Sequence, residues 1–199
     1  MKKCIWRAIC AVFMMGACLA SPLAMAGEAA LPGDVFTAIM LKTMNYDRNA
    51  GRQAKDKVVI GIVCFADDAA GRAFADTVKE NVVKVQGSFT IKDKPVEGKV
   101  IVLEKVYDKA KLEEQLKQEN VSALVVAVTD KTAFADILEL TGKLQISSIC
   151  HDPDCAQNGA GMGIVEKDNK PRMVVNMTTV KREGSDFSGN FLSMCEVVK

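Results

Sequence analysis

The sequence predicts an α/β fold: a single domain with a mainly parallel sheet flanked by helices, followed by a C-terminal antiparallel hairpin and a docked terminal helix. Continuous β-branched apolar runs at 58–65 and 123–128 are typical of strands buried on both faces. Helical patterns of about 10–15 residues separate the strand-like runs, which indicates βαβ crossovers. This alternation ends after residue 149, where two strand-like segments joined by a polar turn predict the hairpin.

Helix caps and apolar periodicity assign the first half of this domain. Asp34 is a suitable cap for a helix that runs to about Tyr46. After strand 58–65, Asp67 or Asp68 caps a helix whose apolar residues recur at every fourth position through Val82. The elements expected next are a short edge strand or hairpin at 89–96, a strand at 100–103 and a helix from Asp108 with Leu112 and Leu116 on one face.

The second half is assigned in the same way. Asp130 or Thr132 opens a helix after strand 123–128, and Gly142 ends it. A strand at 144–149 and the hairpin strands 161–166 and 172–177 follow. The docked terminal helix begins at Asp186 and places five apolar residues on one stripe: Phe187, Phe191, Met194, Cys195 and Val198. No linker or repeat divides residues 27–199, so we expect one domain.

The first 26 residues have the features of a secretory signal peptide. Lys2, Lys3 and Arg7 precede an uncharged apolar run at 8–20, and Ala24-Met25-Ala26 supplies the small residues at a cleavage site. The apolar run is shorter than the roughly 20 residues that a membrane-spanning helix needs. We therefore expect cleavage after Ala26, a periplasmic protein and no membrane span in the remaining chain.

Composition and charge argue against a nucleic-acid partner. The chain has 199 residues, with 26 Lys plus Arg, 25 Asp plus Glu, one His and seven Cys. Its net charge of +1 becomes −2 when the three basic residues of the leader are removed. A nucleic-acid binder usually has a strongly basic face, so this charge balance does not favour one. The cysteines that remain after cleavage are Cys64, Cys150, Cys155 and Cys195.

The segment Cys150-His151-Asp152-Pro153-Asp154-Cys155 gathers two thiols and the single imidazole. We expect a local disulfide between Cys150 and Cys155, because an Asp-Pro turn brings the two residues together in an oxidising compartment. Cys150, His151 and Cys155 are weak candidates for a metal site, since no second Cys or His pair completes the four ligands of zinc. Cys64 and Cys195 are either buried free thiols or a second disulfide pair, and the sequence does not choose between these alternatives.

Few other residues suggest a binding or catalytic site. Asp67 and Asp68 follow the first buried strand, at the end where open α/β sheets place ligand crevices, although Asp at this position is also a typical helix cap. The glycine-rich segment 158–163 leads into a strand, so we interpret it as a turn and not as a phosphate loop. The sequence has no G-x-S-x-G motif, Ser-His-Asp order or paired carboxylates. We therefore expect no catalytic residue, no enzyme activity and no cofactor.

Three stretches resemble the YfiR-like (DUF4154) family of bacterial periplasmic proteins. They are the opening helix Phe36–Asn49, the glycine segment Asn158–Val165, and the C-terminal segments Lys170–Met177, Gly184–Ser188 and Phe191-Leu192. The resemblance implies a regulatory role, because the best-known member is a soluble periplasmic repressor of a membrane-bound diguanylate cyclase. That member binds the periplasmic sensor domain of the cyclase.

From this resemblance we expect a non-catalytic periplasmic regulator. Its partner would be the periplasmic sensor domain of an inner-membrane signalling protein such as a diguanylate cyclase. The resemblance is also compatible with a homodimer. The alternative hypothesis is a small-ligand-binding periplasmic protein similar to one lobe of a solute receptor, motivated by the βα alternation and by Asp67 and Asp68 at a strand end.

Overall fold

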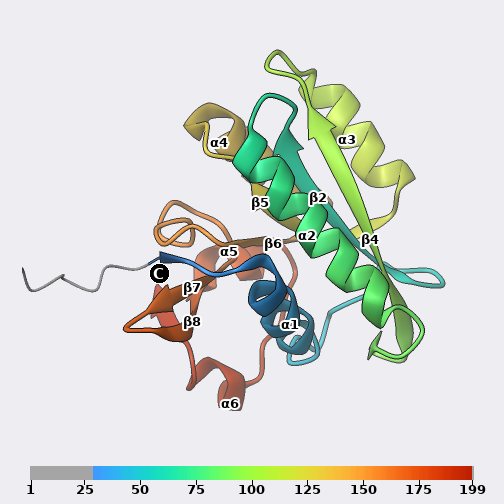
Figure 1. Cartoon of the computed structure of the whole chain (residues 1–199). Helices are drawn as coiled ribbons and strands as arrows, with labels where there is room; N and C mark the ends of the chain where they lie inside the picture. Colours follow the sequence, from blue (N-terminus) through green and yellow to red (C-terminus); the bar gives the residue numbers. More distant parts are fainter. Residues whose placement is uncertain (1–28, 199) are drawn as a thin grey trace, which may run out of the picture.

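A single nine-stranded sheet forms the centre of the molecule, with strand order β3-β4-β2-β5-β6-β7-β8-β9 and with β1 paired to β7 (Figure 1). The computed structural model describes residues 29–198. The expected signal peptide at 1–26 lies outside these described residues. The fold class expected from the sequence is confirmed: the sheet is mostly parallel, helices flank it, and an antiparallel pair follows near the C-terminus.

The elements that the structure contains can be given in chain order. The first half comprises β1 (Ala29–Ala30), α1 (Gly33–Met44), β2 (Val58–Phe65), α2 (Ala69–Val85), β3 (Thr90–Ile91), β4 (Lys94–Leu103) and α3 (Lys109–Gln118). The second half comprises β5 (Val121–Ala127), α4 (Lys131–Leu144), β6 (Ser147–Cys150), β7 (Met162–Lys167), β8 (Lys170–Asn176), α5 (Met177–Arg182), α6 (Gly189–Leu192) and β9 (Glu196–Val198).

β2 is the central strand of the parallel part of the sheet. All eight of its residues are buried, which matches the continuous apolar run in the sequence. It pairs in parallel with β4 on one side and with β5 on the other, so that Ile62 lies between Val100 and Val125. β6 and β7 extend the parallel order beyond β5. The carboxyl ends of these strands therefore meet at one edge of the sheet.

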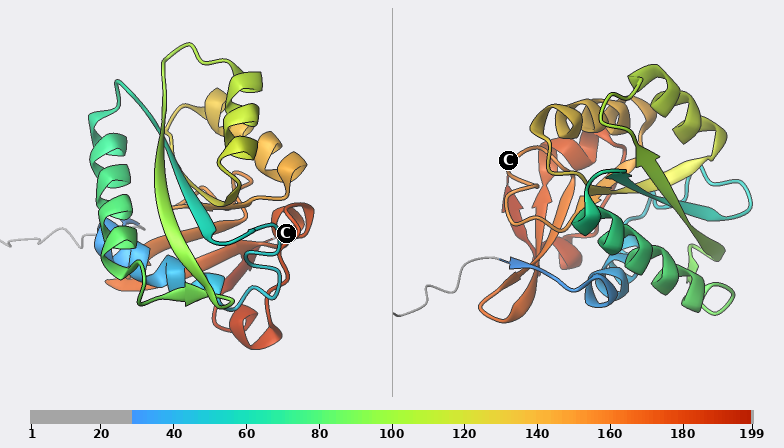
Figure 2. Two further views of the ribbon diagram at one scale, coloured as in Figure 1. Left: turned by 90° about the vertical axis from the view of Figure 1, so that its right-hand side faces the viewer. Right: turned by 45° about the horizontal axis from the view of Figure 1, so that its top comes forward.

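Helices cover both faces of this sheet. The helices α1 and α2 pack on one face, where Phe36, Met40 and Val78 belong to the larger apolar core. The helices α3 and α4 pack on the other face around Leu116 and Ile137. Figure 2 (left) shows the two layers, with α2 on one side of β4 and with α3 and α4 on the other. This arrangement makes β2 and β5 inaccessible from either face.

Three expected boundaries are wrong in detail. The hairpin expected at 89–96 is present, with β3 antiparallel to the start of β4 around a tight turn at Lys92 and Asp93, which both adopt positive φ. The strand expected at 100–103 begins earlier, because β4 runs without a break from Lys94 to Leu103. The helix α1 begins at Gly33 and ends at Met44, with Asp34 in its first turn. Gly142 lies within α4 under the side chain of Arg182, and the helix ends only where Gln145 turns left-handed with φ 54°.

The expectation of one terminal helix from Asp186 is also wrong. The segment docks on the body through Phe191, which is 1% exposed, but it contains the single-turn α6 and then the strand β9. β9 pairs in parallel with β8 and places Val198 opposite Asn176. Met194 is 55% exposed instead of core-facing. The backbone hydrogen bonds that β8 offers outweigh the helical spacing of the apolar residues.

Candidate functional site

The carboxyl ends of β2 and β5 form a topological switch point. The chain leaves β2 toward α2 on one face of the sheet, and it leaves β5 toward α4 on the other. The β2–α2 and β5–α4 connections therefore run apart, and a space is left between them. Open α/β sheets place ligands in the crevice at such a point. This edge is therefore the candidate site.

A pocket of about 500 Å³ lies at this switch point. Its apolar wall includes Phe65 and Tyr107, and its polar wall includes Thr129 and Thr132. The charged residues that line it are Asp67, Asp68, Asp130, Asp136 and Lys105. The excess of carboxylates over ammonium groups favours a cationic ligand over an anionic one. The sequence-based candidates Asp67 and Asp68 thus line a pocket, although their role toward a ligand stays a prediction.

Two of these carboxylates cap helices. Asp68 accepts a hydrogen bond from the Gly71 amide at 2.9 Å and begins α2. Asp130 accepts one from the Ala133 amide at 2.8 Å and begins α4. Each bond satisfies one of the unpaired amides in the first turn of its helix. Asp68 and Asp130, and not the alternatives Asp67 and Thr132, are therefore the caps.

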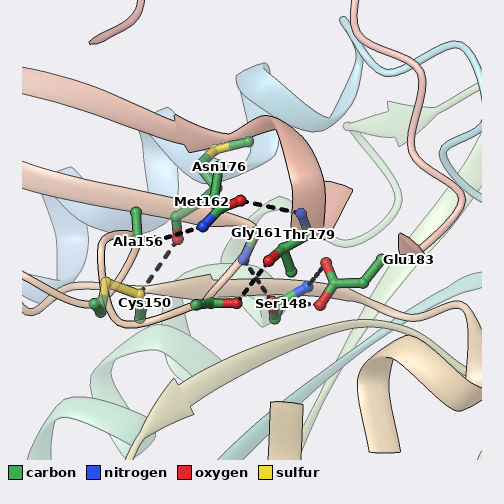
Figure 3. The surroundings of a disulfide bond; sticks show 10 residues. Ser148, Cys150, Ala156, Gly161, Met162, Asn176, Thr179 and Glu183 are labelled. Carbon is green, nitrogen blue, oxygen red and sulfur yellow. Dashed lines mark hydrogen bonds between the residues drawn. A yellow bond between two sulfur atoms is a disulfide. The ribbon is translucent and has the colours of Figure 1, made fainter. Parts of the chain in front are cut away.

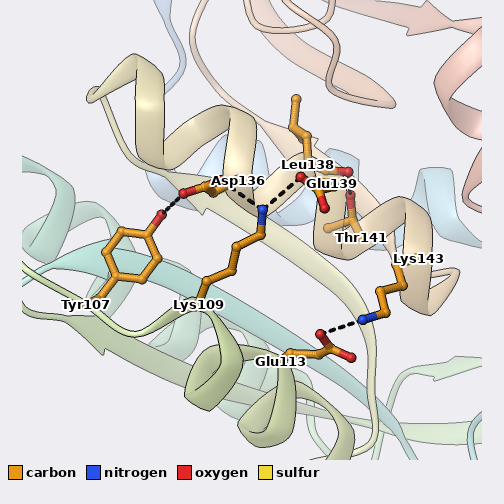
Figure 4. Close-up of polar contacts among 8 residues, drawn as sticks. All are labelled: Tyr107, Lys109, Glu113, Asp136, Leu138, Glu139, Thr141 and Lys143. Carbon is orange, nitrogen blue, oxygen red and sulfur yellow. Dashed lines mark hydrogen bonds and ion pairs between the residues drawn. The ribbon is translucent and has the colours of Figure 1, made fainter.

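Tyr107 and Asp136 both line the pocket, and their side chains are hydrogen-bonded to each other (Figure 4). The Tyr107 hydroxyl donates to Asp136 at 2.9 Å, and Lys109 donates to the same carboxylate at 2.9 Å. Burial and the hydrogen bond to Asp136 raise the pKa of Tyr107 to about 12. The donors Lys109 and Tyr107 hold the pKa of Asp136 below its usual value. The pair therefore presents a charged carboxylate and a neutral phenol to the pocket at neutral pH.

A second pocket, of about 410 Å³, lies on the other side of the first turn of α4. Thr129 lines both pockets, and Phe134 and Lys131 of α4 face the second one. Its opposite wall is the loop that contains Pro153 and Cys155. The start of α4 therefore stands between two hollows along one edge of the sheet.

Cys150 and Cys155 are joined by a disulfide, with their Cα atoms 6.4 Å apart (Figure 3). Both residues are buried, at 1% and 4% exposed. The bond holds the loop after β6, and the Asn176 side chain donates to the Ala156 carbonyl at 3.0 Å to fix the same loop against β8. Because both sulfurs are bonded to each other, neither is a thiolate that could bind a metal with His151.

His151 packs between aromatic rings and not beside a ligand set. Its ring stacks on Phe74 with centroids 3.9 Å apart, and it meets Phe36 edge-on at 6.3 Å. Burial lowers the pKa of His151, against the opposing effect of Asp152 and Asp68. Among residues 29–198, no group of three or more His, Cys, Asp or Glu side chains is placed to hold a metal ion.

Cys64 and Cys195 are free thiols, so the alternative that they form a second disulfide is wrong. Cys64 lies in the central strand β2, whereas Cys195 directly precedes β9 at the end of the sheet. Four strands lie between β2 and β9, which keeps the two sulfurs apart. Burial raises the pKa of both thiols, that of Cys195 to about 11, which favours the protonated thiol over the thiolate at neutral pH.

Glu183 is a buried carboxyl group that the sequence analysis missed. It is 2% exposed and accepts a hydrogen bond from the Thr141 hydroxyl at 2.7 Å. It also accepts hydrogen bonds from the Ser148 hydroxyl and amide at 2.6 and 2.9 Å (Figure 3). Burial raises the pKa of Glu183 to about 7, although these donors and Arg182 oppose the shift. Its neighbours Lys181 and Arg182 are exposed. Three consecutive charged residues are typical of a solvent-exposed segment, so the local sequence does not predict that Glu183 is buried.

The glycine-rich segment is a turn, as expected. Gly159 adopts a φ of 108°, which favours glycine, and the segment leads into β7. At Gly161 an added Cβ would lie 2.6 Å from the Glu183 carboxylate and 3.2 Å from the Ser148 carbonyl. The glycine therefore allows the carboxyl group of Glu183 to sit against the backbone of the turn.

A family model describes nearly all of this domain. The model for the YfiR/HmsC-like family, DUF4154, matches residues 36–196. The chain belongs to this family. The family is regulatory and periplasmic, and its members bind a partner. No helix among residues 29–198 is long and apolar enough to cross a membrane. No curated protein sequence matches the chain.

Solved structures share the fold at low sequence identity. A conserved domain protein from Vibrio cholerae is 11% identical with a TM-score of 0.55, over 84% of this chain and 60% of that one. A ligand-free substrate-binding protein with adhesive properties from Clostridium difficile is 15% identical with a TM-score of 0.52, over 76% and 57%. An ABC domain in complex with L-Trp from Streptococcus pneumoniae is 9% identical with a TM-score of 0.51, over 78% and 60%. The chain spans about 60% of the length of these proteins.

Proposed function

We propose that the protein is a non-catalytic periplasmic regulator of cyclic-di-GMP signalling. Its partner is the periplasmic sensor domain of an inner-membrane signalling protein such as a diguanylate cyclase. The observation that carries this proposal is the family match over residues 36–196, which includes both the parallel sheet and the C-terminal hairpin. The predicted signal peptide at 1–26 supports the same compartment.

Deletion of the gene tests this regulatory role. We expect the cellular level of cyclic di-GMP and biofilm formation to change, and we expect a chromosomal copy to restore both. A copy without residues 1–26 is the matched control, because it makes the same folded domain in the wrong compartment and should not restore them. An unchanged nucleotide level in the deletion strain would contradict the proposal.

A second candidate function is the binding of a small ligand at the switch-point pocket. The specific observation in its favour is a pocket of about 500 Å³ at the carboxyl edge of the parallel strands, lined by aromatic, hydroxyl and carboxylate side chains. The likeness to solute-binding proteins supports the fold alone. This function is compatible with the first, since a ligand could bias the regulator toward or away from its partner.

Thermal-shift measurements on the purified chain test this second function. A panel of amines, amino acids, sugars and anions should contain a compound that raises the melting temperature, and we expect amines to do so more than anions. Replacing Asp67, which lines the pocket but caps no helix, with Asn should reduce that shift, whereas Glu80→Gln on the exposed face of α2 should not. A broad panel without a hit would overturn ligand binding.

A further inference from the structure

The helices α2 and α4 both begin at the switch-point pocket, and a carboxylate of the chain itself already occupies each helix start. A free helix N-terminus attracts an anion, because the amides of its first turn are unpaired and the helix dipole is positive there. Asp68 lines the pocket and accepts the Gly71 amide through its Oδ1 atom at 2.9 Å. Asp130 accepts the Ala133 amide in the same way at 2.8 Å. The chain thus supplies its own anion at both helix starts, which disfavours an anionic ligand at either one.

The carboxylates around the pocket have oxygens available for a ligand. Each cap uses one oxygen, and the second oxygen of Asp68 and of Asp130 accepts no hydrogen bond from residues 29–198. Asp67 is exposed and has neither a hydrogen bond nor an ion pair with the same part of the chain. These oxygens can therefore accept hydrogen bonds from the N–H groups of a cationic ligand.

The charges at the pocket do not balance one another. Four carboxylates line it: Asp67, Asp68, Asp130 and Asp136. Lys105 also lines the pocket, but it makes no ion pair with another residue of 29–198. Lys109 lies outside the lining and pairs with Asp136 at 2.9 Å. Four carboxylates against two ammonium groups leave a net charge of −2, which a ligand with two positive charges would balance.

An aromatic wall separates the carboxylates into two groups. Phe65 and Tyr107 contact each other edge to face, with their ring centroids 6.2 Å apart. Asp67 and Asp68 come just after Phe65 in the chain, and we name them the α2 end of the pocket. The remaining two carboxylates lie on the side of Tyr107.

Asp130 and Asp136 form this second group, which we name the α4 end. Asp136 accepts the Tyr107 hydroxyl at 2.9 Å, and Figure 4 shows its carboxylate between this hydroxyl and the Lys109 ammonium group. Burial, the contact with Asp136 and the charge of Asp130 raise the pKa of Tyr107, so both carboxylates lie near its ring. Because Lys109 pairs with Asp136, the charge of Asp130 stays unpaired at this end.

A linear diamine fits this arrangement better than a metal ion or an amino acid does. A calcium ion needs about six to eight oxygens around one centre, whereas the two rings keep the two ends apart. No group of three or more His, Cys, Asp or Glu side chains in the described chain, 29–198, is placed to hold a metal. An amino acid would bring its own carboxylate to an acidic pocket. Methylene groups, in contrast, pack on aromatic rings, and an ammonium group is attracted to them.

We propose that the switch-point pocket binds a linear aliphatic diamine in its doubly protonated form, with one ammonium group at the α2 end, the other at the α4 end and the methylene chain along Phe65 and Tyr107. The proposal rests on ligand binding at this pocket, the second candidate function above, and names the class of the ligand. It is independent of the identity of the membrane partner.

Isothermal titration calorimetry of the purified chain tests the ligand class. The compounds are 1,5-diaminopentane, 1-aminopentane and 5-aminopentanoate, which keep the same carbon chain and carry two, one and no net positive charges. We expect the diamine to bind at least about tenfold more tightly than the monoamine, because it gains a second charged hydrogen-bonded contact. The amino acid should bind most weakly. Added salt should weaken the diamine more than the monoamine, since more charge is screened.

Removal of one charge from each end tests the pose. Asp67→Asn leaves both helix caps in place, and Asp130→Asn keeps an oxygen that caps α4 as well as aspartate does. Each substitution should raise the dissociation constant of 1,5-diaminopentane about tenfold. Asp130→Asn should also remove most of the advantage of the diamine over 1-aminopentane. Glu80→Gln, exposed on α2, is the matched control and should leave both constants unchanged.

The outcomes separate the ligand class from the binding function itself. A diamine that binds no more tightly than 1-aminopentane, or whose affinity neither Asp→Asn substitution changes, overturns the proposal. If another compound of the ligand panel then stabilises the chain and loses this effect in Asp67→Asn, the pocket binds a ligand and only the diamine class is wrong. If no compound of the panel binds, the diamine and the second candidate function both fail.

Discussion

At the scale of single residues, the carboxyl group of Glu183 links three elements that are far apart in the sequence. It stands at the end of α5 and accepts hydrogen bonds from Thr141 of α4 and Ser148 of β6. Ser148 in turn accepts a hydrogen bond from the Gly161 amide at 2.7 Å, which holds the turn before β7. A buried network of this kind stabilises the fold only when every member is satisfied.

Glu183 should make stability depend on pH. Its pKa is raised to about 7 from an ordinary value of 4.5, so the folded state binds this proton more tightly than the unfolded chain does. The stabilising effect is therefore complete below pH 4.5, declines as the pH rises, and is lost above pH 7. The difference between the two pKa values corresponds to a loss of about 3 kcal/mol in the free energy of unfolding.

Glu183→Gln removes this titration while it keeps an acceptor and a donor in place. We expect the free energy of unfolding of the variant, relative to the wild type, to increase by about 3 kcal/mol between pH 4.5 and pH 8. Urea denaturation at the two pH values measures this. Glu80→Gln, an exposed carboxyl on α2, is the control and should show no such change. If the free energy of unfolding of Glu183→Gln differs from that of the wild type by the same amount at both pH values, the carboxyl group is not protonated in the folded state.

The disulfide between Cys150 and Cys155 should contribute modestly to stability. It closes a loop of only about six residues, for which the chain-entropy relation gives roughly 2 kcal/mol. We expect the Cys150→Ser/Cys155→Ser variant to unfold at lower urea, and dithiothreitol to bring the wild type to the same midpoint. Dithiothreitol should not change the variant. A wild-type chain whose midpoint does not move after reduction of this bond, verified by mass spectrometry, would contradict the estimate.

At the scale of elements, the helix caps show which parts of the fold can be predicted from short stretches of sequence. Asp68, Asp108 and Asp130 each accept amide hydrogen bonds at the start of a helix. Each lies directly before an amphipathic stretch, and this combination predicts the start of a helix without reference to distant residues. The buried strands β2 and β5 also have a local signal, because a strand covered on both faces is apolar at nearly every position, whereas a strand with one exposed face alternates.

Replacing the cap of α2 distinguishes the two roles of the Asp pair. We expect Asp68→Ala to lower the free energy of unfolding by about 1 kcal/mol, since the Gly71 amide loses its acceptor. Asp67→Ala should change stability by less than about 0.5 kcal/mol, because this neighbouring side chain caps no helix. Thermal and urea unfolding of the two variants measure the difference. Equal losses from both substitutions would contradict the assignment of Asp68 as the cap.

Other elements depend on distant partners and could not be predicted from local pattern. The apolar residues from Phe187 to Val198 have helical spacing, yet the last of them join β8 as a strand, because an unpaired strand edge is available there. Gly142 has the residue type of a helix end but lies inside α4, where Arg182 covers it. Glu183 reads as a surface residue and is buried by β6 and α4. In each case a contact made across many residues outweighs the local preference.

At the scale of the whole molecule, the carboxyl edge of the sheet holds the switch-point pocket between α2 and α4. The helices α1 and α2 cover one face of the sheet, and α3 and α4 cover the other. Asp67 lines the pocket and caps no helix, so its replacement changes the pocket without removing a cap. Ligand binding can therefore be tested separately from stability.

The central claim is that the protein binds the periplasmic domain of an inner-membrane signalling protein. The most direct measurement is crosslinking of the tagged chain in intact cells, followed by purification from membranes under oxidising and reducing conditions and mass spectrometry. We predict enrichment of an inner-membrane protein that carries a periplasmic sensor domain and a diguanylate cyclase domain, and binding of that isolated sensor domain to the purified chain. Recovery of no such membrane protein in either condition, with the tagged chain present in the periplasm, would contradict the claim.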